Sequence, residues 1–261
     1  AMGQQTLTTN TTGSGNTAIG HVALGDNTTA SNNTAVGYLA LNANTTAPNN
    51  VAVGSGAGDA LTTGGYNVAI GTNALSTATT TTANVAVGER ALEDCTGEQN
   101  TALGAHTLRD NTSGNANVAV GYFALGVNTT GDRNIAVGYG ALDALTTPDY
   151  NVGVGYIALG ATTTGANNTA LGSFAMQSNT TASNNTALGY ASLTLNTTGT
   201  GNVAVGHDAL NVSTTADNNT AVGYDAGGQI TTGPNNVAIG YDSLDGLTTG
   251  YSNVCVGKGT T

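Results

Sequence analysis

The stretch NNTAVGYLAL, residues 32–41, contains the five-residue phrase that decides the fold: Asn, then Thr, Val or Ile, then Ala, an aliphatic residue and Gly. The phrase returns in NNVAVG, at positions 49–54, and repeats to the end of the chain. There are fifteen copies at a constant period of seventeen, with one step of sixteen between Gly88 and Gly104. An unbroken short period is typical of a solenoid, in which each repeat forms one coil stacked on the last.

The phrase itself predicts a short β-strand. With its Gly taken as position 0, position −1 is always Val, Ile or Leu, and position −3 is Val, Ile or Thr. Position −2 is Ala in thirteen copies, the exceptions being Gly153 and Cys255. Successive side chains of a strand point to opposite sides. We therefore expect positions −3 and −1 to face the interior of the coil and positions −2 and −4 to face outward.

The rest of the coil indicates a second inward segment and a turn. Position +4 is usually Leu, which we expect to be buried. Where it is Gly58 or Gly227, an aliphatic residue follows three positions later, Leu61 or Ile230, and is expected to replace the missing core side chain. Thr-Thr recurs at positions +8 and +9, and no helical period is sustained. The predicted fold is all-β: a parallel β-roll, or β-solenoid, of about fifteen 17-residue coils.

The repeat defines the domain organisation. We expect a partial first repeat at 1–15, in which residues 1–3 also fit a cloning remnant, a β-roll domain at 16–257, and a truncated repeat at 258–261. Solenoids normally carry polar caps at their ends, and the C-terminal end stops inside a repeat without one, so we interpret the chain as part of a longer protein.

Two columns of the repeat are held constant. An Asn stands at position −4 of every copy, and a stack of such side chains is expected to bond from coil to coil as a structural ladder; it includes Asn33, Asn50, Asn67, Asn117, Asn134, Asn151 and Asn185. The small residue at −2, expected to face outward, predicts close packing of another chain in a homotrimer. That interface would contain Ala35, Ala52, Ala69, Ala119, Ala136, Ala170 and Ala187. The alternative is that Ala faces a turn of its own coil.

Composition excludes several classes of function. The net charge of −11 with only four basic residues argues against nucleic-acid binding. No apolar run is long enough for a membrane span, so we expect no membrane insertion. The sequence holds no catalytic constellation, metal-ligand spacing or phosphate loop, and it predicts no enzyme and no cofactor. Cys255 is expected to be a small buried residue and Cys95 to be exposed.

Two features remain as candidate binding sites. Tyr recurs at +1, where stacked rings would form either a stabilising ladder or a stripe that contacts a glycan or protein of a host-cell surface. The partner-binding candidates are Tyr122, Tyr139, Tyr156, Tyr224 and Tyr241. The second feature is the irregular repeat at 89–110, which contains seven of the nineteen charges and the one-residue deletion. It is either a tolerated variation or a bend or ligand site.

The phrase Asn-Val-Ala-Val-Gly-x-x-Ala, at 117–124 and 202–209, resembles the head repeat of YadA-like trimeric autotransporter adhesins, which reads Asn-Ser-Val-Ala-Ile-Gly-x-x-Ser. The resemblance extends through all fifteen copies and implies a left-handed β-roll, a homotrimer and a cell-surface adhesin. The 17-residue coils and the Gly-Tyr-x-Ala-Leu and Asn-Thr-Thr-Gly elements depart from that pattern. They resemble repeats of bacterial surface and phage or virus tail-fibre-like proteins.

These observations predict a non-enzymatic structural or adhesive module of an extracellular surface adhesin or virion fibre, whose main partner is itself. The alternative is an ice-binding protein that uses Thr ladders on a flat solenoid face. An extended Thr-Thr pair would place only one of its two side chains on each face, so each face would carry a single Thr row.

Overall fold

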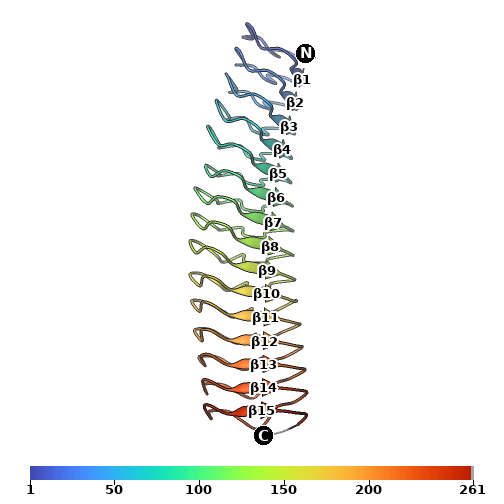
Figure 1. Cartoon of the computed structure of the whole chain (residues 1–261). Helices are drawn as coiled ribbons and strands as arrows, with labels where there is room; N and C mark the ends of the chain where they lie inside the picture. The colour runs from blue at the N-terminus through green and yellow to red at the C-terminus, as the bar shows by residue number, and fades with distance from the viewer. Residues whose placement is uncertain (260–261) are drawn as a thin grey trace. The chain divides into compact units, whose positions relative to one another are not determined.

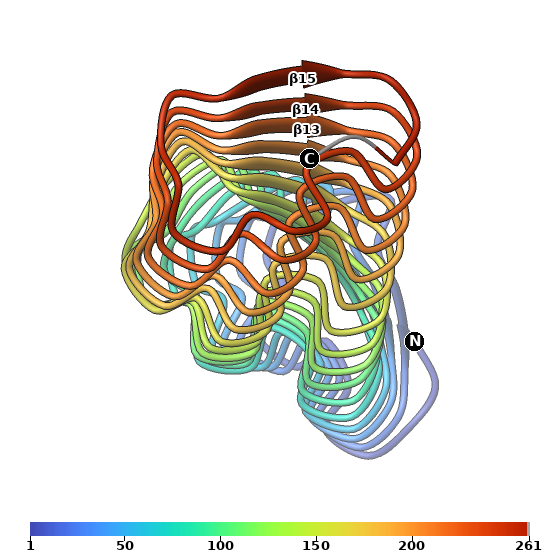
Figure 2. The same cartoon turned by 90° about the horizontal axis from the view of Figure 1, so that it is seen from below.

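A computed structural model describes residues 1–259 and divides the chain into two compact units, Ala1–Arg133 and Asn134–Thr261. Each unit is a stack of similar coils with one short strand per coil (Figures 1 and 2). Within the described residues there are strands and turns but no helix. The predicted all-β parallel solenoid, with one coil for each copy of the repeated phrase, is confirmed.

Every strand is three residues long and lies where the repeated phrase predicts it. The strands of the first unit are β1 (Thr17–Ile19), β2 (Thr34–Val36), β3 (Val51–Val53), β4 (Val68–Ile70), β5 (Val85–Val87), β6 (Thr101–Leu103) and β7 (Val118–Val120). Those of the second are β8 (Ile135–Val137), β9 (Val152–Val154), β10 (Thr169–Leu171), β11 (Thr186–Leu188), β12 (Val203–Val205), β13 (Thr220–Val222), β14 (Val237–Ile239) and β15 (Val254–Val256).

Within each unit the strands pair in parallel with the register that the repeat dictates. Thr186 pairs with Val203, and Ala187 with Ala204, so each residue faces the equivalent position of the next copy. Ahead of β1, Met2 forms a single parallel bridge to Ile19, and Gly3 takes the same positive φ as the Gly of every later coil. Residues before the first full phrase therefore follow the path of one more coil.

The orientation of the strand side chains is the reverse of the prediction. The residue at −2 is the buried one: Ala18 through Ala238 are 0–1% exposed, whereas side chains at −3 and −1 are half-buried or exposed. The expected trimer-interface column is therefore interior to a single chain, and the prediction that it faces outward is wrong for Ala35, Ala52, Ala69, Ala119, Ala136, Ala170 and Ala187.

The reason is the width of the coil. Leu at +4 is fully buried, as predicted, and fills the interior opposite the strand. At Gly153, the one glycine at −2, an added Cβ would lie 3.1 Å from Leu142 Cγ. Only a methyl group fits between the strand and this leucine, so the larger aliphatic residues of the strand must point outward. Leu61 and Ile230 are also buried and fill the space beside Gly58 and Gly227, which confirms their predicted role.

The invariant Gly at position 0 lets consecutive coils approach closely. Its φ lies between 124° and 145° in the fifteen phrases, a region that favours glycine. A Cβ added at Gly206 would lie 2.1 Å from the carbonyl oxygen of Gly223 in the next coil. Any side chain at this position would push the coils apart.

The Asn at −4 joins each coil to the next within both units. Asn202 is buried; its Oδ1 accepts the backbone N–H of Asn219 at 2.9 Å, and its Nδ2 donates to the carbonyl of Ala216 at 2.7 Å. Within each unit the residues singled out from the sequence take the same role; Asn33 Oδ1, for example, accepts the N–H of Asn50 at 2.8 Å. The Oδ1 and the Nδ2 of this side chain thus both bond to the backbone of the next coil and fix its position.

A second buried Asn column, at +7, has no counterpart in the sequence analysis. It includes Asn27, Asn44, Asn111, Asn128, Asn179 and Asn196, all 0% exposed. Asn196 Nδ2 donates to Asn179 Oδ1 at 3.1 Å and to the carbonyl of Gly199 at 3.0 Å. The sequence did carry a signal for this column, because Leu61, Leu145 and Ile230 stand at the same position and imply that it is buried.

Candidate interaction surfaces

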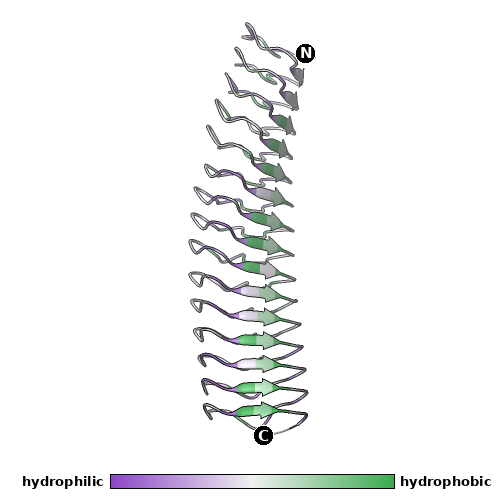
Figure 3. Cartoon of the chain, in the orientation of Figure 1, coloured by the Kyte–Doolittle hydropathy of each residue, from purple (hydrophilic) through white to green (hydrophobic). Residues whose placement is uncertain are grey.

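The outward side chains of the strands form the first candidate site, named here the strand face: positions −3 and −1 of every coil. Figure 3 shows the apolar residues concentrated on the strands. Ile135 is 39% exposed, Leu171 38%, Leu188 45% and Ile239 38%. Contiguous apolar surface of this kind marks interaction sites in soluble proteins. Each unit thus presents a flat strip of aliphatic and Thr side chains to its surroundings.

The second candidate, the aromatic ladder, is the file of rings at +1 in the second unit. Tyr139 and Tyr156 stack with ring centroids 5.5 Å apart, and Tyr224 stacks on Tyr241 at 5.3 Å. His207 lies between Tyr190 and Tyr224, with centroids at 4.9 and 5.2 Å. The ladder tyrosines are 46–53% exposed. The spacing is that expected from stacked coils, at about 4.8 Å per strand.

One rung of the ladder comes from a different position. The coil of Gly172 has Ser173 at +1, and Phe174 at +2 supplies the ring instead, 5.3 Å from Tyr156 and 5.7 Å from Tyr190 in edge-to-face geometry. Side chains at +1 and +2 therefore share one surface. The sequence held the signal, since the aromatic residue moves by one position where +1 is Ser.

The first unit has only pieces of such a ladder. His21 stacks on Tyr38 at 5.6 Å, but the next residues at +1 are Ser55, Thr72, Glu89 and Ala105. A separate cluster follows, in which His106 contacts Tyr122 and Phe123 at 5.8 and 6.5 Å. The partner-binding candidates Tyr122, Tyr139, Tyr156, Tyr224 and Tyr241 thus lie in different surroundings: Tyr122 in this cluster of the first unit, the others in the ladder of the second.

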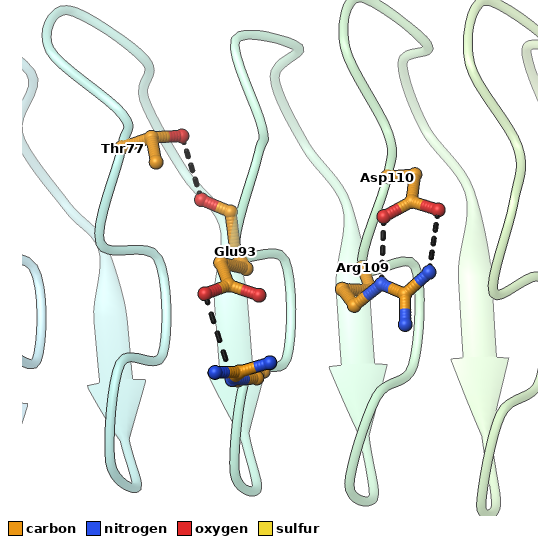
Figure 4. A network of polar contacts seen from close by, with 5 residues as sticks. Thr77, Glu93, Arg109 and Asp110 are labelled. Carbon is orange, nitrogen blue, oxygen red and sulfur yellow. Dashed lines mark hydrogen bonds and ion pairs between the residues drawn. The ribbon is translucent and has the colours of Figure 1, made fainter.

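The irregular repeat carries two groups of polar contacts, one around Glu93 and one between Arg109 and Asp110 (Figure 4). Arg109 forms a bidentate pair with Asp110, at 2.7 Å for both bonds, and its guanidinium lies 5.4 Å from the Phe123 ring. Arg90 pairs loosely with Glu93 at 3.7 Å, and Thr77 Oγ1 donates to the Glu93 carbonyl at 2.7 Å. Strands β5 and β6 keep their register across the deletion.

The deletion removes an exposed residue of the turn. Thr96 occupies +8 and Gly97 takes the place of the buried residue at +10, so the missing residue is the Thr of +9. In regular coils the Thr at +8 donates its hydroxyl to the carbonyl of the next +8, as Thr197 does to Thr214 at 3.1 Å. The Thr at +9 is exposed in every coil that has it. Its loss removes one backbone bond to the next coil, the counterpart of Thr198 N–H to the Thr214 carbonyl at 3.3 Å, but the Thr96 N–H still donates to the Thr112 carbonyl at 2.8 Å.

Cys95 lies inside this coil, and the prediction that it is exposed is wrong. It occupies +7, the buried polar column, with its Sγ 3.5 Å from Asn111 Nδ2 and 3.9 Å from Asn100 Nδ2. Burial raises the pKa of the Cys95 thiol to about 11. The thiol is therefore held neutral and shielded, which is unsuited to nucleophilic or metal chemistry.

Residues 1–259 form no pocket and bring no three His, Cys, Asp or Glu side chains together as metal ligands. Over the same range no helix is long and apolar enough to cross a membrane. Comparison of the chain with protein-family models, with curated proteins and with solved structures returned no match. The candidate functional sites of the chain are therefore the strand face and the aromatic ladder.

Proposed function

We propose that this chain is a non-enzymatic repeat module of an extracellular surface adhesin or fibre, and that it assembles as a homotrimer through the strand face. The observation that carries the proposal is the exposure of aliphatic residues at −1 in coil after coil, such as Leu171, Leu188 and Val222. A solvated sheet face ordinarily carries polar side chains. Apolar residues held outward along a whole strand column favour contact with another chain.

The threefold state is supported by the resemblance of the Asn-Val-Ala-Val-Gly phrase to trimeric adhesin head repeats. An interface formed by positions −3 and −1 would be more stable than one formed by the Ala column, because Val, Ile and Leu bury more apolar area than Ala does. Each such side chain contributes about 1.5–3 kcal/mol when fully buried. The extracellular location and the adhesive role rest on the same resemblance.

The experiment is light scattering after size exclusion, which should give about three times the 25.5 kDa chain mass. Leu171→Lys with Leu188→Lys, on neighbouring coils of the strand face, should shift the protein toward monomer. Thr181→Lys with Thr198→Lys adds the same charges to exposed turns of the same two coils and should leave the mass unchanged. A wild-type protein that is monomeric at micromolar concentration would overturn the proposal.

Ice binding finds less support in the geometry. Hydroxyls at +8 are engaged with carbonyls of the next coil, as Thr28 with Thr45 at 3.0 Å, so the exposed Thr at +9 forms a single row. A single row does not make a plane of ordered hydroxyl and methyl groups. Thermal hysteresis in a solution of the protein would favour the ice-binding function over the adhesive one.

A further inference from the structure

The aromatic ladder changes character toward the end of the second unit, where it gains a parallel file of carboxylates. Position +2, which reaches the same surface as +1, holds Asp208, Asp225 and Asp242 in three consecutive coils. Asp208 Oδ2 lies 2.9 Å from His207 Nδ1. We name this surface the acidic end of the ladder: the rings of Tyr190, His207, Tyr224 and Tyr241 and these three aspartates.

From this arrangement we propose that the acidic end of the ladder is a docking surface for a flexible cationic segment of another protein, rich in Lys or Arg. Each of three consecutive coils presents one ring and one carboxylate side by side, so a basic side chain meets a carboxylate for its charge and aromatic surface for its aliphatic stem. The inference does not depend on the strand face or on the oligomeric state.

Charge complementarity points to this partner. Residues 134–261 carry seven Asp and one Lys, with no Arg, so the chain itself supplies almost nothing to neutralise the file. Partial burial, together with the nearby carboxylates of Asp242 and Asp208, raises the pKa of Asp225. The aspartates therefore repel one another, and a partner that brings positive charge would relieve that repulsion.

The chain already shows how a cation uses this surface. The ammonium of Lys258 lies 5.3 Å from the centre of the Tyr241 ring, at the last rung of the ladder. In the first unit, on a different surface, the guanidinium of Arg109 lies 5.4 Å from the centre of the Phe123 ring while it pairs with Asp110. In both cases a cation lies over an aromatic ring, which is a cation–π geometry, and at Arg109 a carboxylate accompanies the ring.

A glycan fits this surface less well, because sugars stack on ring faces. Here the rings stack on one another, with Tyr190, His207, Tyr224 and Tyr241 inclined by only 11–24° in successive pairs, so their faces are covered along the ladder. What remains is ring edges, Tyr hydroxyls and carboxylates. That set favours a flexible chain with hydrogen-bond donors and positive charge.

The test is fluorescence anisotropy of a labelled deca-lysine peptide with the full chain at low ionic strength. Asp208→Asn with Asp225→Asn and Asp242→Asn should weaken binding about tenfold, since each exposed ion pair contributes modestly. The matched control, Asp26→Asn with Asp94→Asn and Glu98→Gln, removes the same charge from exposed sites of the first unit and should change binding less than about twofold. Equal weakening by both sets, or no saturable binding by the wild type, would overturn the proposal.

A second variant separates the rings from the charges. Tyr224→Ser with Tyr241→Ser keeps every carboxylate and should still weaken deca-lysine binding several-fold; unchanged affinity in a variant with a normal circular dichroism spectrum would contradict a docking surface that uses the ladder. If the double variant does not fold, Lys258→Gly serves in its place. Removing the resident cation from Tyr241 should leave deca-lysine binding as tight or tighter, and weaker binding would count against the proposal.

Discussion

The two units of the chain share their interiors and differ on their surfaces. Both keep Gly at 0, Ala at −2 and Asn at −4 in every described coil, with Gly153 and Cys255 as the exceptions at −2. The second unit carries a continuous aromatic ladder, whereas the first interrupts it with Ser55, Thr72, Glu89 and Ala105 and contains the shortened coil. The difference shows that the interior side chains specify the coil, whereas the side chains at +1 and +2 vary and the Thr at +9 is missing from one coil.

The contacts of each position explain why the interiors of the two units are alike and their surfaces differ. Interior columns pack so closely against the next coil that a change of side-chain volume or of hydrogen bonding is not accommodated; at Gly206 even an added Cβ would overlap the carbonyl oxygen of Gly223. Outer positions contact solvent and their own neighbours along the file. A deletion at +9 is therefore absorbed in the first unit without a change of register between β5 and β6.

The largest expected effect tests whether the interior is equivalent in the two units. Gly88→Ala, in the coil that contains the deletion, and Gly206→Ala, in a regular coil, should each cost more than about 4 kcal/mol, because the new Cβ overlaps the carbonyl of the next coil. Hydrogen exchange of the β5 and β12 amides, followed by mass spectrometry, measures the loss within each unit.

The control for this pair is Gly140→Ala. Gly140 also has a positive φ, of 57°, but the nearest atom to an added Cβ is Asp143 Oδ2 at 3.5 Å. Its cost should be only about 1–2 kcal/mol, that of the left-handed backbone. If Gly88→Ala were as mild as this control, the interior of the first unit would be looser than that of the second and the comparison would fail.

These columns also show what the sequence could and could not predict. The period of the Asn-to-Gly phrase predicted the positions of all fifteen strands and their register within each unit. In a solenoid with a fixed repeat, each strand residue pairs with the equivalent residue of the next coil. The direction of the strand side chains was predicted in reverse. Alternation alone does not say which side is inside when both sides are apolar; the answer depends on Leu142 and its equivalents at +4, which cross the coil from another segment.

The sequence predicted only part of the surface, because the rest also depends on how separate positions come together in the folded coil. The Tyr column at +1 was visible in the sequence, but the contributions of Phe174 and of the aspartates at +2 depend on the turn that brings +1 and +2 to one surface. Burial of Cys95 was likewise missed, because the deletion at +9 had to be located before its position at +7 could be assigned. Local turn geometry, rather than composition, decided these cases.

The second prediction compares the two buried Asn columns. Asn202→Leu leaves the Asn219 N–H and the Ala216 carbonyl buried without their partners, and should cost about 3 kcal/mol. Asn196→Leu, at +7, should cost less, about 1 kcal/mol, because it deprives only Asn179 Oδ1 of its donor: the Gly199 carbonyl keeps its bond from Asn185 Nδ2, and Leu145 shows that the column accepts an aliphatic side chain. Urea denaturation measures both; equal losses would contradict the special role of the −4 column.

The third prediction concerns the first unit alone and uses the buried thiol. The Cys95 thiol has a pKa of about 11 in the folded chain and 9.0 as a free group, so the unfolded state loses its proton at lower pH. Its contribution to stability is complete below pH 9 and is lost as the pH rises, by about 2 kcal/mol at pH 11. Cys95→Ala should flatten this part of the stability profile, and a slope equal to that of the wild type would show that the thiol is not shielded.

The smallest expected effect tests whether the ladder is stronger where it is continuous. Tyr224 stacks on two rings, His207 and Tyr241, whereas Tyr38 in the first unit stacks on His21 and is followed by Ser55. Since a stacked pair contributes about 1 kcal/mol beyond its buried area, Tyr224→Ser should cost about 1 kcal/mol more than Tyr38→Ser. The two tyrosines are similarly exposed, at 48% and 53%, so differences in burial do not account for the gap. Hydrogen exchange of the β13 and β2 amides reports each loss within its own unit.

A second substitution, Tyr241→Ser, separates stacking from the intrinsic preference for Tyr. In that background Tyr224 keeps one stacking partner, His207, and the cost of Tyr224→Ser should fall to that of Tyr38→Ser. Equal costs in the wild-type background would mean that the rings are only neighbours. The continuous ladder would then be a feature of the surface alone and would not contribute to the stability of the fold.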